Sequence, residues 1–207
     1  MNRFNQFFLL VCLLASAGLS AQSFGVRAGV NATNADVSVS NLDIDTDGET
    51  NLMLGLFVDL PLGTELISVQ PELNYLNRGY SFTATVGGNE FSRTVSYLEL
   101  GALLKLNFGR DEGLGFYVGA GPQYGYAVSG TETNINGDRD VDVDFDRINR
   151  GQLQFAGVGG LTFGSNFRFF VEARYNGIFA DQDGDDSSEI RQRSLGLNGG
   201  VMIPLGN

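Results

Sequence analysis

Seven residues in the first quarter of the chain carry carboxylates at the spacing of a calcium loop. Residues 43–49 read DIDTDGE, which places Asp43, Asp45 and Asp47 at positions 1, 3 and 5 of an EF-hand loop. Position 12 would be Leu54, where that loop requires a bidentate glutamate. A complete EF-hand is therefore excluded. Two alternatives stay open: a weak calcium site built from the three aspartates with the acidic run at 181–186, or a solvated acidic loop.

A second set of charged residues stands inside segments that are otherwise apolar, small or uncharged. Its members are Arg27, Glu72, Glu99, Lys105, Glu172 and Arg174. All six fall on the polar side of segments in which apolar residues alternate with polar or small ones. Charges removed from water are retained when opposite charges pair with them. The pattern therefore predicts an ion-pair network inside the fold.

Nucleophilic catalysis lacks its usual residues in this chain. The sequence contains no histidine, and its one cysteine, Cys12, lies in an apolar run near the N-terminus. The Ser–His and Cys–His pairs that activate a nucleophile are therefore unavailable. Carboxylate pairs exist, but they lie in connecting segments or beside basic residues. We expect no enzymatic activity and no cofactor.

The elements that must position these residues alternate with a period of two, which is typical of β-strands. Eight such segments can be read, at 23–36, 51–60, 65–78, 94–108, 114–128, 150–163, 167–180 and 192–205. Short connections at 61–64, 109–113 and 164–166 alternate with long ones at 37–50, 79–93, 129–149 and 181–191. This layout predicts an all-β fold, an eight-stranded antiparallel up-and-down transmembrane β-barrel with its long loops on one side.

The apolar face could point outward to lipid or inward to a core. Charged residues in mid-strand favour a polar interior, and apolar faces of about ten residues suit a tilted membrane strand. Several aromatic residues fall near strand ends, as interfacial girdles do, although Phe57 falls on the polar face. The alternative architecture is an exported, soluble, lipocalin-like barrel that binds a ligand, with its apolar face inward.

The N-terminus has the order of a secretory signal peptide. Arg3 precedes an apolar run and then small residues that end at Ala21. We expect residues 1–21 to be the signal peptide and residues 22–207 to be the barrel domain. Removing Arg3 with the signal leaves a net charge of about −12. So acidic a chain is not expected to bind nucleic acid, which requires a basic surface.

Four stretches of the sequence resemble a known family. They are QPELNYLNRGYSF (70–82), SYLELGALLKLNFG (96–109), GFYVGAGPQYGY (115–126) and VEARYNGIF (171–179). They resemble the outer-membrane protein β-barrel domain family, whose members are described as porin-family or PorT-like proteins and are similar to the small OmpX/OmpA-type barrels. The resemblance covers about residues 22–205, and it implies location in the cell outer membrane of a Gram-negative bacterium.

An eight-stranded barrel is just wide enough for side chains to fill its interior. We therefore expect a filled lumen and a structural or surface-interaction role through acidic outer loops. The alternative is a narrow porin-like channel for small solutes or ions. The expected partners are outer-membrane lipid and, through the loops, an extracellular ligand or protein, with the barrel itself a monomer. The Asp/Val/Phe alternation DRDVDVDFDR (138–147) predicts a hairpin that extends above the membrane.

Overall fold

The computed structural model describes residues 22–39, 42–44, 47–83, 90–109, 113–134, 139–142, 150–165, 167–178 and 188–205. The expected signal peptide (1–21), Asp45 of the calcium candidate and the acidic run at 181–186 lie outside the described residues. None of the described residues belongs to a helix long and apolar enough to cross a membrane.

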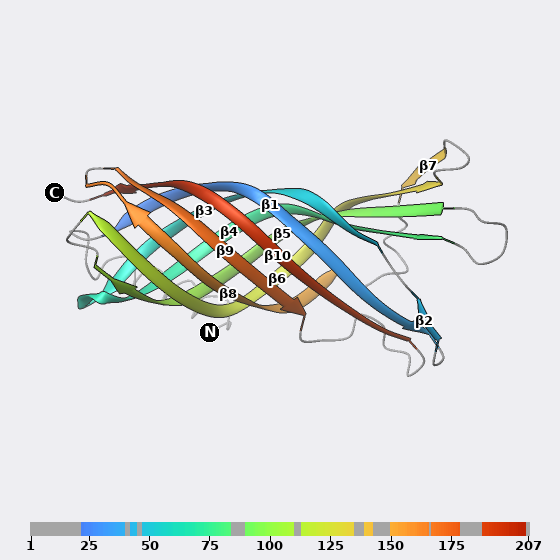
Figure 1. Ribbon diagram of the computed structural model, residues 1–207, viewed down its shortest axis with the longest axis horizontal. Coiled ribbons are helices and arrows are strands. Elements are labelled where there is room, and N and C mark those ends of the chain that lie inside the picture. Colours follow the sequence, from blue (N-terminus) through green and yellow to red (C-terminus); the bar gives the residue numbers. More distant parts are fainter. Residues whose placement is uncertain are drawn as a thin grey trace, which may run out of the picture.

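Eight long antiparallel strands form a closed barrel (Figure 1). They are β1 (Ser23–Val39), β3 (Asp47–Leu62), β4 (Thr64–Thr83), β5 (Glu90–Phe108), β6 (Leu114–Asn134), β8 (Gly151–Phe163), β9 (Arg168–Ile178) and β10 (Ser188–Pro204). Each pairs with the next long strand along the chain, and β10 closes the barrel on β1. Closure pairs the edges that an open sheet would leave exposed to lipid. The predicted fold class is confirmed.

Two short strands extend the barrel at the end that carries the long connections (Figure 1). Strand β2 (Leu42–Ile44) pairs with the end of β1, and β7 (Arg139–Asp142) pairs with the end of β6. The sequence predicts a loop over residues 37–50, and for residues 42–44 that prediction is wrong. Strand β7 forms part of the hairpin predicted from residues 138–147, of which residue 138 and residues 143–147 lie outside the described part.

The opposite end of the barrel carries the short turns. Leu62 and Thr64 pair with each other around Gly63, which has a φ of 72°. Glycine adopts this left-handed conformation without the steric penalty of a side chain. The other short turns join Phe108 to Leu114 and Phe163 to Arg168 at the same end. The predicted alternation of short and long connections is confirmed.

Apolar residues face outward and polar residues face inward along the long strands. On β5, Leu100 and Leu104 are 58% and 56% exposed, whereas Glu99 and Lys105 are 0% and 1% exposed. Successive side chains of a strand point to opposite faces, so the pattern repeats around the wall. An apolar outer surface with a polar interior belongs to a membrane barrel. The lipocalin-like alternative is not favoured, because it would place the apolar face inside.

Aromatic residues mark the two boundaries of the apolar band. Phenylalanine rings gather near the short turns, where Phe108 stacks on Phe116 at 4.7 Å and Phe163 on Phe169 at 5.8 Å between ring centroids. Exposed tyrosines lie toward the other end, as in Tyr126 on β6. Tyr126 lies ten positions after Phe116 on β6. At strand rise and barrel tilt, this distance spans roughly the 25 Å apolar band of outer-membrane barrels.

The strands end at different heights above the tyrosines. Strand β8 begins at Gly151, which is opposite Tyr126, while β6 continues to Asn134. Strands β4 and β5 continue with β6, from Asn77 opposite Ser96 to Thr83 opposite Glu90. The strands predicted to end at 78, to begin at 94 and to end at 128 are therefore too short at these ends. Above the membrane both faces of these strands are largely polar, so the alternation on which the prediction rested fades there.

Candidate functional site

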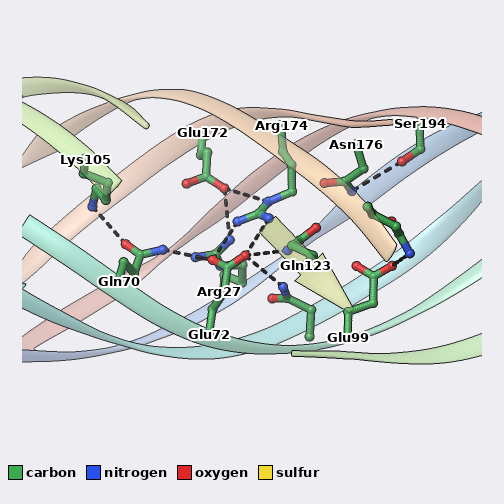
Figure 2. Close-up of polar contacts among 12 residues, drawn as sticks. Arg27, Gln70, Glu72, Glu99, Lys105, Gln123, Glu172, Arg174, Asn176 and Ser194 are labelled. Carbon is green, nitrogen blue, oxygen red and sulfur yellow. Dashed lines mark hydrogen bonds and ion pairs between the residues drawn. The ribbon is translucent and has the colours of Figure 1, made fainter. Parts of the chain in front are cut away.

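The lumen is the candidate site, because the inward face of the barrel concentrates the buried charges. Figure 2 shows Arg27, Glu72, Glu172 and Arg174 pointing toward one another across the interior. These four residues come from β1, β4 and β9, which the closed barrel brings to opposite sides of the lumen. All four are at most 3% exposed.

Glu72 is the centre of the network. Its two carboxylate oxygens accept parallel bonds from Arg174, at 2.7 Å from Nη1 and 2.8 Å from Nη2. Arg27 Nη2 lies 3.0 Å from the second of these oxygens, and Gln123 donates to the first at 2.7 Å. A two-bonded arginine–carboxylate pair fixes geometry as well as charge. The Glu72 side chain therefore connects its own strand, β4, to three others: β1, β6 and β9.

Glu172 links the same two arginines from the other side. Its Oε1 lies 3.1 Å from Arg27 Nη1 and 3.3 Å from Arg174 Nε. The Tyr117 hydroxyl donates to Oε2 at 2.9 Å. Gly160 makes room for this tyrosine, because a Cβ at that position would come within 2.6 Å of the Tyr117 ring and hydroxyl. Tyr117, Gly160 and Glu172 are register partners on β6, β8 and β9, so the absence of a side chain on Gly160 lets Tyr117 cross β8 to reach Glu172.

Lys105 lies on the short-turn side of the central cluster. Its ammonium donates to Gln70 Oε1 at 2.9 Å and lies 3.8 Å from the Asp59 carboxylate. It also lies 4.1 Å from the centroid of the Tyr117 ring, within the range of a cation–π contact. Gln70 in turn donates to Glu72 at 3.0 Å. One continuous chain of contacts therefore joins Lys105 to the Glu72 centre.

A second cluster lies nearer the long connections. Arg78 of β4 pairs with Glu99 of β5 and receives support from two glutamines of β8. Its Nη2 donates to Gln154 at 2.7 Å and its Nη1 to Gln152 at 3.3 Å. Gln154 also donates to Glu99 at 3.0 Å. This cluster crosses the lumen between β4 and β8 as the first one does between β4 and β9.

The buried charges of the described lumen balance. The four cations are Arg27, Arg78, Lys105 and Arg174, and the four carboxylates are Asp59, Glu72, Glu99 and Glu172. Each of the eight has an opposite charge within 4 Å. Leaving one such charge unpaired in a site shielded from water is strongly unfavourable. Removing one of the eight charges therefore takes an opposite charge away from each of its buried partners.

An apolar layer fills the lumen near the short turns. The rings of Phe57 and Phe170 meet edge to face at 5.6 Å, and Met202 completes the cluster. The Arg27 guanidinium lies 4.6 Å from the Phe57 centroid, so this layer touches the charged centre directly. The polar-face position of Phe57 is therefore that of a lumen-filling side chain.

The structure brings together five of the six residues singled out from the sequence. Arg27, Glu72, Glu172 and Arg174 form the centre, and Lys105 joins it through Gln70. Glu99 belongs instead to the Arg78 cluster. Sequence reasoning missed two charged members, Arg78 and Asp59. Both lie on the polar side of their strands, so the same alternation could have identified them.

The calcium candidate stays a prediction. Asp43 falls in β2 and Asp47 opens β3, while Asp45 lies outside the described residues. Among the residues that the structure does describe, no group of three or more potential ligand residues is placed to hold a metal ion. The lumen carboxylates are paired with arginine and lysine side chains.

Comparison with known proteins agrees with this architecture. Residues 20–181 match the family model described as outer membrane protein beta-barrel domain. Neisserial surface protein A is similar in structure, with a TM-score of 0.51, 15% identity, and coverage of 87% of this chain and 96% of that one. The outer membrane protein OprG from Pseudomonas aeruginosa has a TM-score of 0.51 at 14% identity, with 89% and 97% covered. No protein with a curated description matches the sequence.

Proposed function

The chain belongs to the outer membrane protein β-barrel domain family, and we propose that it is a closed-lumen barrel that makes contacts at the cell surface. The protein lies in the outer membrane, where its apolar outer face contacts lipid. The two finer parts of the proposal concern the lumen and the outer end, and different observations support them.

The observation that carries the closed lumen is the position of Glu72. Its carboxylate forms ion pairs with Arg27 and Arg174 from two other strands, so these side chains occupy the middle of the barrel. The apolar layer of Phe57, Phe170 and Met202 fills the next level. The interior of an eight-stranded barrel is no wider than such side chains. We therefore propose a supporting role for the network in place of solute passage.

The outer end supports a role in surface interaction. Strands β4, β5 and β6 continue beyond the tyrosines. The connections after β6 and after β9 are rich in aspartate, at 138–146 and 181–186 respectively. Segments displayed on a rigid scaffold commonly carry binding function. The proposed partner is an extracellular ligand or protein that tolerates an acidic surface. The proposal includes export with cleavage of residues 1–21, a monomeric barrel, and no catalytic activity.

Capture on intact cells tests the surface role. Residues 143–149 and 181–187 would be replaced by Gly/Ser segments of equal length, and proteins crosslinked to the barrel would be compared with those of the unaltered chain. A matched control replaces residues 110–112 at the opposite end. We expect the outer replacements to lose partners that the control keeps. An identical partner set in all three proteins would contradict a loop-mediated role.

Swelling of proteoliposomes in sugar solutions tests the closed lumen separately. We expect no swelling above that of empty liposomes, because paired side chains occupy the interior. Swelling that increases with protein content would instead support the channel alternative.

A further inference from the structure

The outward face of the extension above the tyrosines carries an ordered set of hydroxyl side chains. Three rows cross β4, β5 and β6 in register, in each of which a residue of β4 is opposite one of β5 and that one is opposite one of β6. The rows are Asn77–Ser96–Ser129, Gly79–Thr94–Thr131 and Ser81–Ser92–Thr133. The described side chains of these rows are half-buried or exposed, Gly79 excepted.

Alternation places these rows on the outside of the barrel. On β4 they continue the side of Leu73 and Tyr75, which face lipid. The opposite side of the same extension carries Val95, which is buried, and the ion pair of Arg93 with Glu132. We call the outward set of seven Ser and Thr residues together with Asn77 the hydroxyl face.

Glu49 fastens the hydroxyl face at its centre. The register of β3 against β4 shifts between Gly48 and Met53, and from this irregular stretch the Glu49 carboxylate crosses Gly79. It accepts from the Ser92 hydroxyl at 2.6 Å and from Thr94 at 3.4 Å. A Cβ at Gly79 would fall 1.9 Å from the Glu49 Oε2 atom, so a side chain there would displace the carboxylate from this position.

The charge of this face limits what it can bind. Among the described side chains of the hydroxyl face and its fastening residue, Glu49 carries the one charge, and that charge is negative. A phosphate headgroup would therefore meet no cation among these side chains, and the Glu49 carboxylate would repel it. Hydroxyl groups donate and accept hydrogen bonds at once, which suits uncharged sugars.

An apolar groove of about 330 Å³ lies in the lipid-facing wall on the neighbouring strands. Its apolar lining is Val26, Leu54, Leu56, Leu73, Tyr75 and Leu98. Tyr75 pairs with Leu98, and the next outward pair along the same two strands is Asn77 with Ser96. The groove therefore leads directly from the hydrocarbon region of the membrane to the first row of the hydroxyl face.

We propose that this continuous surface binds an uncharged glycolipid of the outer leaflet. One acyl chain lies in the groove, and the sugar headgroup bonds to the hydroxyl face. The apolar groove and the hydroxyl face meet at Tyr75. This residue marks the boundary at which a lipid changes from acyl chain to headgroup. The site faces the membrane sideways, on the side of the wall opposite the lumen. Its outer end borders an acidic segment, because Thr131 and Thr133 pair with Asp142 and Asp140 of β7.

Lipid retention in nanodiscs tests the proposal with two probes of matched acyl chains, a diglucosyl diacylglycerol and phosphatidylglycerol. Folded protein is released from mixed nanodiscs and its bound lipids are counted by native mass spectrometry. We expect the glycolipid to be retained about tenfold over phosphatidylglycerol, as two net hydrogen bonds would produce. Equal retention, or preference for phosphatidylglycerol, overturns the proposal.

Two variants locate the site. Thr94→Val with Thr131→Val removes two hydroxyls at nearly constant volume and is expected to abolish the preference. Val26→Phe fills the groove and is expected to lower glycolipid retention while the hydroxyls remain. The control, Thr64→Val with Ser165→Ala, removes two hydroxyls in the short turns and should change nothing. Heat-modifiable gel mobility confirms that each variant is folded, and a preference that survives both site variants contradicts the assignment.

Discussion

The lumen and the hydroxyl face are both polar, but they differ in exposure. The lumen charges are buried and pair with one another, whereas part of the hydroxyl face is exposed to solvent. In the lumen, Glu72 and Arg174 bond to each other, and all eight buried charges are paired within the described interior. On the hydroxyl face, Thr131 and Ser129 are exposed above the membrane. Polar groups that satisfy one another hold the wall together, whereas exposed ones remain available to a ligand. We propose on this ground that the lumen network supports the barrel and that the hydroxyl face binds a ligand.

Closure of the barrel is the condition on which both regions depend. Deleting residues 193–207 removes most of β10 and leaves the edges of β1 and β9 unpaired in lipid, which is severely unfavourable. We expect no folded barrel from this variant, judged by the loss of heat-modifiable mobility on a gel.

Deleting Arg139–Asp142, which removes β7 alone, serves as the comparison. That strand pairs only with the end of β6 among the described strands, so this variant should still fold. Folding of the β10 deletion to a heat-modifiable species would refute the closure argument.

The Glu72 centre is expected to show the largest effect of a single lumen substitution. Glu72→Leu leaves two buried arginines, Arg27 and Arg174, with Glu172 as their one shared carboxylate, which should lower the free energy of unfolding by about 3–5 kcal/mol. Urea unfolding in lipid vesicles, followed by tyrosine fluorescence, measures the change. Glu72→Gln retains hydrogen bonding and should lie between Glu72→Leu and the unaltered protein. A stability unchanged by Glu72→Leu would mean that the pairing contributes nothing.

A charge on the lipid face should cost less than breaking the lumen centre. Leu104→Arg places a cation near the middle of the apolar band, where the expected loss is about 2–4 kcal/mol. Leu114→Arg, close to the short turns and the interface, should lose about 0–1 kcal/mol. The same urea titration compares them, and equal losses at the two positions would contradict the assigned height of the membrane.

The exposed ion pair of the extension should matter least. Arg93 lies 3.4 Å from Glu132, whose side chain is 52% exposed. Glu132→Gln is therefore expected to change the free energy of unfolding by about 0–1 kcal/mol. A loss comparable to that of Glu72→Leu would erase the distinction between buried and exposed pairs.

Alternation along the strands was enough to predict the barrel and the inward charges. Glu72 and Arg174 stand out because a period of two assigns every residue of a strand to one face or the other. The partners could not be predicted, since Arg27 reaches Glu172 from 145 residues away in the sequence. Only the closed register brings β1 and β9 within reach of the same carboxylate.

The outer ends were the part that the sequence predicted least well. Ser92, Thr94 and Ser96 alternate with Arg93 and Val95, so neither face there is strongly apolar and the strand signal weakens. The hydroxyl face appears only when three strands are aligned, because its rows join residues from 77 to 133. The position of the Glu49 side chain over Gly79 depends on a local register shift between β3 and β4, which no sequence pattern predicts.

Planar-bilayer recording of the purified chain tests the central claim, a lumen closed by paired side chains. A large-pore porin recorded under the same conditions establishes sensitivity. Because Arg27, Glu72 and Arg174 occupy the middle of the barrel above the Phe57 layer, we expect no stable conductance steps. Large, long-lived steps from pure folded protein would contradict the closed lumen.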